Sequence, residues 1–218
     1  MSSALTLHEL TASPNNLKVR IALGYKGLEY RRKPVDLKEF PGDRASVVRL
    51  SRQPRLPVLE HGTTVIFGSD AILRYLEANF PETPPLFIDD YEKFGEIEQW
   101  ELFARTQLGE PIGMFFGQLF APEADATVLR KANELLHERT GGIEDKLSTG
   151  EFLVGDHLTA GDIACAAFLQ LADQTDDHAR SHPLLGFFHQ HMHLGEQRDR
   201  TRAWSRRVVS YDPVVGRR

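Results

Sequence analysis

The chain has 218 residues, of which 41% are hydrophobic, with a single cysteine and a formal net charge of −5. This length suits one large or two small domains with a substantial core. One cysteine excludes an internal disulfide and is typical of a reducing cytoplasm. There is neither an apolar run of about eighteen residues, as a membrane span requires, nor a secretory signal pattern. We therefore expect a cytoplasmic protein.

The charge is unevenly distributed. Residues 1–82 carry a net charge of +3, residues 83–195 of −12 and residues 196–218 of +4. A slightly basic N-terminal part suits an anionic ligand. The acidic middle argues against nucleic acid as a main partner. We expect neither nucleic acid nor a membrane as a partner.

The first eighty residues begin with a strand and a helix. Apolar and polar residues alternate from Leu5 to Leu10, which predicts a half-buried strand. Residues 11–16 are dense in turn and capping residues, and the apolar positions of 17–23 predict a helix after them. A second strand is predicted over 30–35, and a less regular stretch follows it.

A hairpin and a capped helix come next. Two β-rich runs, 55–59 and 65–67, are joined by a polar turn that contains glycine. Ser69 or Asp70 then precedes an apolar helical pattern, as a capping residue does. Because a helix N-terminus offers free N–H groups and partial positive charge, it is a place to hold a carboxylate. The order of elements over 4–79 is thioredoxin-like.

Three prolines between residues 79 and 85 end this part and predict a stiff linker. The segments beyond it with helical spacing are 90–110, 123–147, 160–173, 184–193 and 201–210. We therefore expect a first domain over 1–80, a linker over 81–88 and an all-helical domain over 89–218. Thr159 lies three residues before Asp162, which predicts a capping box at the third of these helices.

Four segments, in this order, resemble motifs of the soluble glutathione transferases. Residues 13–23 resemble the active-site loop and first helix, 55–59 the cis-proline strand, 68–72 the glutamyl-binding motif and 158–163 the capping box of the C-terminal domain. The resemblance covers about residues 4 to 215. It implies an α/β thioredoxin-like domain (βαβ-ββα) followed by an all-α domain, with glutathione as co-substrate, a homodimer and no metal.

The resemblance implies that Ser13 donates a hydrogen bond to the glutathione sulfur, because it matches the serine of serine-type members. An unperturbed thiol has a pKa of ~8.5, so a hydroxyl and a helix N-terminus are needed to ionise it. Ser13 also reads as an ordinary N-cap, and Thr11 and Asn15 are the reserve candidates. No tyrosine lies in residues 5–20, which argues against a tyrosine-type mechanism. Cys165 reads as core because its neighbours are apolar.

The resemblance also implies the glutathione-binding residues. Pro57 is expected to be cis, and the backbone of Leu56 to pair with the cysteinyl backbone of glutathione. Ser69 is expected to bind the γ-glutamyl carboxylate, which is the same geometry as a plain N-cap. Arg55, and with less support Arg52 or Gln53, is placed to meet the glycyl carboxylate.

Gly68 departs from the family pattern, which has Glu, Asp or Gln at this position to hold the ammonium group of the ligand. Glycine cannot do this, so we expect weak glutathione binding unless Asp70 or an acid of a partner subunit compensates. One charge-assisted hydrogen bond is worth ~1.5–3 kcal/mol. On the sequence alone, Gly68→Glu is therefore expected to tighten binding by about tenfold or more.

The electrophile is expected to bind between the domains. Met114, Phe115 and Phe116 form an apolar run flanked by glycines that suits such a pocket, and it reads equally well as helix core. His189 and His193 share a helix face, but no carboxylate or cysteine motif accompanies them, so no metal is expected.

The residues and the resemblance together predict an enzyme that activates the glutathione thiolate for attack on an apolar electrophile. Conjugation, ether cleavage, peroxide reduction and isomerisation share these motifs. The alternative is a non-catalytic binding or regulatory protein of the same fold that has lost tight glutathione binding, and Gly68 is the residue that favours it.

Overall fold

The computed structural model describes residues 4–35, 44–173, 176–180 and 183–214. The chain forms two compact units: one contains the chain up to Leu86 and again from Ser210, and the other is Phe87–Val209. The division after Leu86 lies within the stretch 81–88, whereas the segment from Ser210 groups with the N-terminal unit and not with the helical one.

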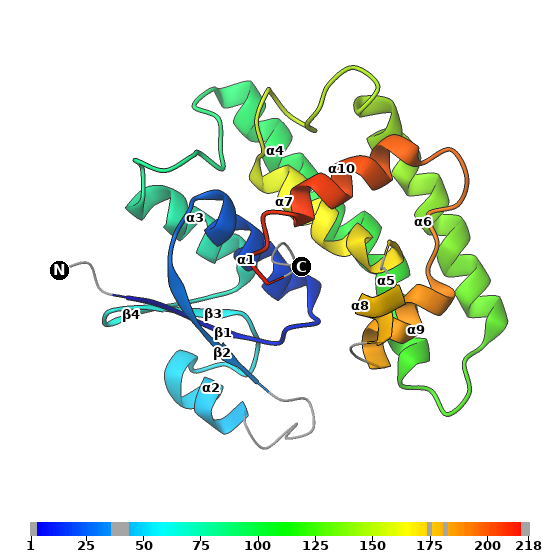
Figure 1. Cartoon of the computed structure of the whole chain (residues 1–218), viewed down its shortest axis with the longest axis horizontal. Helices are drawn as coiled ribbons and strands as arrows, with labels where there is room; N and C mark the ends of the chain where they lie inside the picture. The colour runs from blue at the N-terminus through cyan, green and yellow to red at the C-terminus, as the bar shows by residue number, and fades with distance from the viewer. Residues whose placement is uncertain (1–3, 36–43, 174–175, 181–182, 215–218) are drawn as a thin grey trace. The chain divides into compact units, whose positions relative to one another are not determined.

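The N-terminal unit is built on a four-stranded mixed sheet of β1 (Leu5–Glu9), β2 (Tyr30–Pro34), β3 (Val58–His61) and β4 (Thr64–Phe67). The strand order is β2-β1-β3-β4, with β1 parallel to β2 and antiparallel to β3, and with β3 and β4 antiparallel. The helices α1 (Pro14–Tyr25) and α3 (Ser69–Asn79) lie on one face and α2 (Arg44–Ser51) on the other (Figure 1). This is the predicted thioredoxin-like arrangement.

The core of the N-terminal unit follows from the alternation of apolar and polar residues along β1. Leu5 and Leu7 are buried, and they share the core with the apolar residues of α1 and α3. Burying each such side chain contributes ~1.5–3 kcal/mol. No pattern in the sequence predicted α2, which falls in the less regular stretch after the second strand. Its apolar signal is weak, because Val47 faces the core whereas its neighbour Val48 is 39% exposed.

The second unit is helical, as predicted. Its helices are α4 (Tyr91–Phe103), α5 (Gly109–Leu119), α6 (Ala126–Lys146), α7 (Ala160–Leu169), α8 (Asp176–Arg180), α9 (Pro183–His191) and α10 (Asp199–Val209), with a π-helical segment at Ala104–Leu108 and a 3₁₀ turn at Gln170–Ala172. Every residue of α7 is buried, so this helix is the centre of the unit. None of the helices in the described part of the chain is long and apolar enough to cross a membrane.

Asp162 organises the N-terminus of α7. Its carboxylate accepts hydrogen bonds from the Thr159 N–H at 3.0 Å and the Thr159 hydroxyl at 2.7 Å, which confirms the predicted capping box. The same carboxylate accepts from the Leu153 N–H and from the Trp204 indole N–H, each at 2.9 Å. Burial raises the pKa of Asp162 above its ordinary value, against the effect of these donors. One side chain thus joins a loop, α7 and α10.

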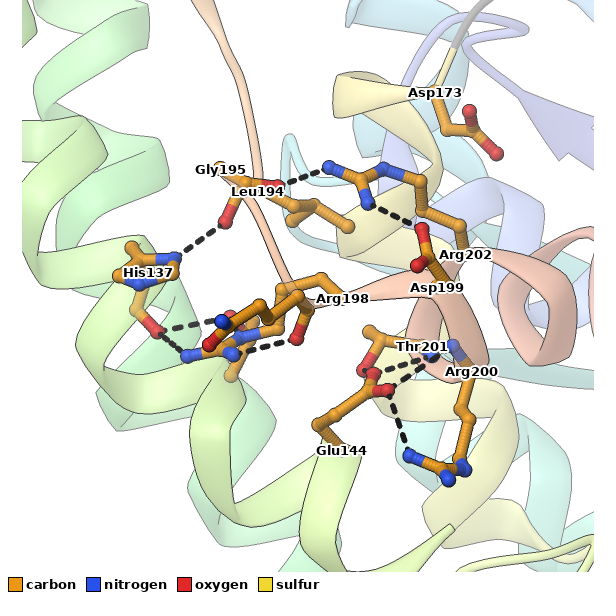
Figure 2. Close-up of polar contacts among 12 residues, drawn as sticks. His137, Glu144, Asp173, Leu194, Gly195, Arg198, Asp199, Arg200, Thr201 and Arg202 are labelled. Carbon is orange, nitrogen blue, oxygen red and sulfur yellow. Dashed lines mark hydrogen bonds and ion pairs between the residues drawn. The ribbon is translucent and has the colours of Figure 1, made fainter. Parts of the chain in front are cut away.

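Glu144 of α6 closes the N-terminus of α10 (Figure 2). It accepts hydrogen bonds from the N–H groups of Arg200 at 3.2 Å and Thr201 at 2.9 Å, and from the Thr201 hydroxyl at 2.8 Å. The first N–H groups of a helix have no partner within it, so a carboxylate from another helix satisfies them. Next to it, Arg198 donates to the His137 carbonyl at 2.7 Å. Arg198 also donates to the Thr140 hydroxyl at 3.1 Å.

We expect Glu144→Gln to lower the free energy of unfolding by about 1–2 kcal/mol at pH 7, the loss typical of a charged cap. Burial opposes ionisation of Glu144, but the donors from Thr201 and Arg200 hold its pKa below the ordinary value of 4.5. Its contribution is therefore present above pH 4.5 and is lost as the pH falls through the lower folded value. Urea unfolding of both proteins between pH 7 and pH 3 measures the difference, which should shrink with acid. The exposed Glu138→Gln on the same helix is the control, and an equal loss there would contradict the capping role.

Candidate functional site

The loop between β1 and α1 holds Ser13 at the start of a helix. Its N–H donates to the Leu10 carbonyl at 3.0 Å, and Ser13 is the N-cap of α1 with an extended backbone at φ −82° and ψ 129°. Asn16 Oδ1 accepts from the Leu10 N–H at 3.2 Å and closes the loop from the other side. Pro14 at the first helical position suits a helix start, since its missing N–H would have had no partner.

The hydroxyl of Ser13 is not used as the helix cap, although the residue occupies the capping position in the described structure. Ser13 is half-buried, whereas Asn15 is exposed. Thr11 is also exposed, and its hydroxyl accepts a hydrogen bond from Arg32 Nη2 at 3.2 Å. Of the three candidates, Ser13 combines a position at the positive end of α1 with a hydroxyl that does not bond the helix.

The predicted cis peptide between Leu56 and Pro57 is confirmed. The Pro57 carbonyl accepts from the Gly68 N–H at 3.2 Å, so the start of β3 is joined to the start of α3. Leu56 is half-buried and lies two residues before the start of β3.

The start of α3 contains the predicted carboxylate-binding residue. Ser69 is the first residue of the helix and is 8% exposed. Its hydroxyl donates to Asp70 Oδ1 at 3.2 Å, and the same oxygen lies 4.0 Å from Lys18 Nζ of α1. Lys18 is buried except for 5% of its side chain. The start of α3 therefore brings together a lysine, a hydroxyl and a helix N-terminus, which favour an anion, and the carboxylate of Asp70, which the lysine and the hydroxyl already approach.

Gly68 precedes α3 with φ +87° and ψ 129°, a conformation that strongly favours glycine. A Cβ at this position would meet nothing within 4 Å, so the restriction comes from the backbone and not from crowding. From the sequence, Gly68 is only a position without the family's acid, and no local pattern indicates this backbone restriction.

The loop before β3 shows which polar groups are already engaged. Gln53 donates from Nε2 to the Arg55 carbonyl and to Ser51 Oγ, each at 2.9 Å, and accepts from the Arg55 N–H at 2.6 Å. Its amide thus holds the loop together. Arg52 has a positive φ of 61° and is exposed, as is Arg55. Arg55 remains the proposed partner of the glycyl carboxylate.

Of the proposed electrophile residues on α5, Phe115 is fully buried and Met114 and Phe116 are half-buried. The ring of Phe115 lies 6.1 Å from that of Phe188, and Phe116 packs edge-on against Phe188 at 4.9 Å. This placement gives Phe115 a core role, and the pocket stays a proposal for its neighbours. Cys165 is buried as predicted.

No group of three metal-ligating side chains occurs within residues 4–35, 44–173, 176–180 and 183–214. His189 Nε2 lies 3.2 Å from Asp176 Oδ1.

Comparison with known proteins decides the family. Residues 7–84 match the family model of the glutathione S-transferase N-terminal domain, and residues 91–193 match that of the C-terminal domain. The chain is 30% identical to glutathione S-transferase F10 of Arabidopsis thaliana over 158 residues, which are 69% of this chain and 73% of the relative. The chain belongs to the glutathione S-transferase family.

Other similar members differ in what their names describe. This chain is also 30% identical to FtsZ-localized protein A of Caulobacter vibrioides over 184 residues, which are 81% of each protein. Among solved structures, Ure2p in complex with glutathione superimposes with a TM-score of 0.77 at 20% identity, over 100% of this chain and 93% of that one. At this identity the likeness shows the fold.

Proposed function

We propose that this chain is a serine-type glutathione transferase in which Ser13 stabilises the thiolate of glutathione. The observation that carries the proposal is the Ser13 hydroxyl, which occupies the N-cap position of α1 without capping the helix. Its proton is therefore available to donate to a sulfur placed at the helix N-terminus, where the partial positive charge adds to the effect.

The chemistry requires a lower thiol pKa. Each unit of lowering needs ~1.4 kcal/mol of preferential thiolate stabilisation. A hydrogen bond to a charged group contributes ~1.5–3 kcal/mol, so one hydroxyl lowers the pKa by about one to two units. The thiolate then attacks an apolar electrophile; in a conjugation the new carbon–sulfur bond forms as the leaving group departs with the electron pair.

Glutathione is held at three points in this proposal. The γ-glutamyl carboxylate binds at the N-terminus of α3 through the Ser69 hydroxyl and free N–H groups, near the charge of Lys18. The cysteinyl backbone pairs with the backbone of Leu56, and Arg55 meets the glycyl carboxylate. Met114 and Phe116 contribute to the electrophile site.

The ammonium of the γ-glutamyl group lacks a dedicated partner. Gly68 has no side chain, and Asp70, the proposed substitute, already lies close to Lys18 and accepts from the Ser69 hydroxyl. A carboxylate engaged in this way loses part of its interaction when it turns to a ligand. We therefore propose weak glutathione binding for this member of the family.

We expect Gly68→Glu to leave glutathione affinity nearly unchanged, and not to tighten it as the sequence alone predicts. A charge-assisted hydrogen bond contributes ~1.5–3 kcal/mol, but a non-glycine residue at φ +87° costs ~1–3 kcal/mol. We expect the free variant to relax out of this conformation, so that glutathione binding must restore it and the two contributions offset each other. Gly68→Ala has the same backbone cost without the carboxylate and is the matched control. By calorimetry, glutathione should bind the Glu variant about tenfold or more tighter than the Ala variant. Equal affinities of the two variants would show that position 68 does not face the ammonium.

A non-catalytic binding protein of the same fold is the second candidate. The absence of an acid at Gly68 favours it, as does the likeness to FtsZ-localized protein A, whose name describes a localisation and not a transfer reaction. Retention on immobilised glutathione, followed by an assay with glutathione and an aromatic halide, separates the two. Turnover supports the transferase, and failure of both tests supports the binding protein.

The proposal includes a homodimer in the cytoplasm that acts in detoxification. The exposed side chains of Tyr91, Phe94 and Leu102 lie on one side of α4 and suit a contact with a second copy.

A further inference from the structure

The C-terminal segment 210–214 packs on the N-terminal unit and brings a buried acid to α1. Asp212 is 0% exposed, and its two carboxylate oxygens accept from Arg20 Nε at 3.2 and 3.0 Å. It also accepts from the Val214 N–H at 3.0 Å, which fixes the turn of the segment.

The C-terminal segment can approach α1 closely because residue 24 of the helix is a glycine. A Cβ on Gly24 of α1 would lie 1.9 Å from the Tyr211 carbonyl oxygen, so only glycine allows this approach. The rings of Tyr25 and Tyr211 meet edge to face with centroids 5.1 Å apart.

Arg20 connects the segment to the end of β1. Its Nη1 donates to Glu9 Oε2 at 2.5 Å, and both side chains are buried. Burial alone would lower the pKa of the Arg20 guanidinium, but Asp212 and Glu9 raise it above its ordinary value. Glu9 also binds Arg32 Nε of β2, and Arg32 donates to the Thr11 hydroxyl at 3.2 Å. Two carboxylates and two arginines thus form a neutral row of side chains from the C-terminal segment to the loop of Ser13. In order, its members are Asp212, Arg20, Glu9 and Arg32.

We infer that Asp212 is a positioning residue for the loop 10–13. It neutralises Arg20, so that Glu9 is shared between Arg20 and Arg32. When the charge of Asp212 is removed, Glu9 is the one carboxylate within the described part of the chain that still pairs with Arg20, and its interaction with Arg32 weakens. Arg32 then no longer holds Thr11, and the end of β1, whose Leu10 carbonyl accepts from the Ser13 N–H, is less restrained. The consequence for catalysis rests on the proposed function, whereas the consequence for loop order does not.

Hydrogen exchange of the whole protein tests loop order without reference to activity. In Asp212→Asn, the amides of Leu10 and Ser13 should exchange about tenfold or more faster than in the unmodified protein. The amides of α7 should be unchanged, which shows that the protein remains folded. Asp156→Asn, which alters a fully exposed carboxylate, should change neither group.

Gly24→Ala tests the same inference through a steric clash, and it replaces Asp212→Asn as the test if that variant does not fold. It prevents the approach of Tyr211 while leaving all four charges in place, and it should also accelerate exchange at Leu10 and Ser13. Gly142→Ala is the matched control, because a Cβ there meets nothing within 4 Å.

Kinetics with glutathione and an aromatic halide add the second readout. Asp212→Asn should lower kcat by about threefold to tenfold and leave the KM for glutathione nearly unchanged, because Ser69 lies outside the row. Unchanged exchange at Leu10 and Ser13 in both variants would overturn the inference. Faster exchange in a protein that turns over no substrate would support the positioning of the loop and count against the transferase.

Discussion

Ser13→Ala should lower kcat about ten- to a hundredfold at neutral pH while the KM for glutathione stays nearly constant. The hydroxyl lies at the N-cap of α1 and does not bond the helix in the described structure, so its removal leaves the helix start intact. The hydrogen bond that we propose from this hydroxyl to the glutathione sulfur is stronger to a thiolate than to a thiol, so its loss should affect ionisation and not anchoring. Steady-state kinetics with glutathione and an aromatic halide measure both constants.

The pH profile distinguishes this role from a loss of structure. As the pH rises the thiol ionises without help, so the deficit of Ser13→Ala should shrink. Ser69→Ala is the matched control and should raise the KM for glutathione first, because Ser69 is expected to bind a carboxylate.

Two neighbouring variants show whether the assignment is right. Thr11 is held by Arg32 and Asn15 is exposed, so Thr11→Ala and Asn15→Ala should have smaller effects than Ser13→Ala. Full activity in Ser13→Ala together with inactivity in either of the others would move the catalytic role to that residue.

Asp162→Ala should have the largest effect on stability, a loss of about 3–5 kcal/mol in the free energy of unfolding. Four hydrogen bonds converge on this buried carboxylate from the backbone of Leu153, from Thr159 twice and from Trp204. Leaving one buried donor without a partner costs ~1–3 kcal/mol, and relaxation recovers part of the sum. Urea unfolding followed by tryptophan fluorescence measures the loss.

Asp145→Ala, an exposed position on α6, is the control and should change stability by less than about 0.5 kcal/mol. Thr159→Ala removes one of the four donors and should lie between the two. A loss of less than about 1 kcal/mol in Asp162→Ala would show that the capping box contributes little to the helical unit.

The sequence by itself determined the elements that depend on local patterns. Alternation in 5–10 indicated β1, and the proline and capping residues of 13–16 indicated the start of α1. The turn at 61–63 indicated the hairpin before α3, and the spacing of Thr159 and Asp162 indicated the capping box. In each case the signal lies within a few residues, because strand period, helix period and capping are local properties of the backbone.

The tertiary structure alone decided which partners the polar side chains take. Asp212 pairs with Arg20 across 192 positions, Lys18 of α1 approaches Asp70 of α3, and Gln53 turns back on its own loop. The positive φ of Gly68 likewise follows from the junction of β4 with α3. Such pairings depend on which buried charge requires neutralisation in the folded chain, and a local pattern contains no information about a partner that folding brings from elsewhere.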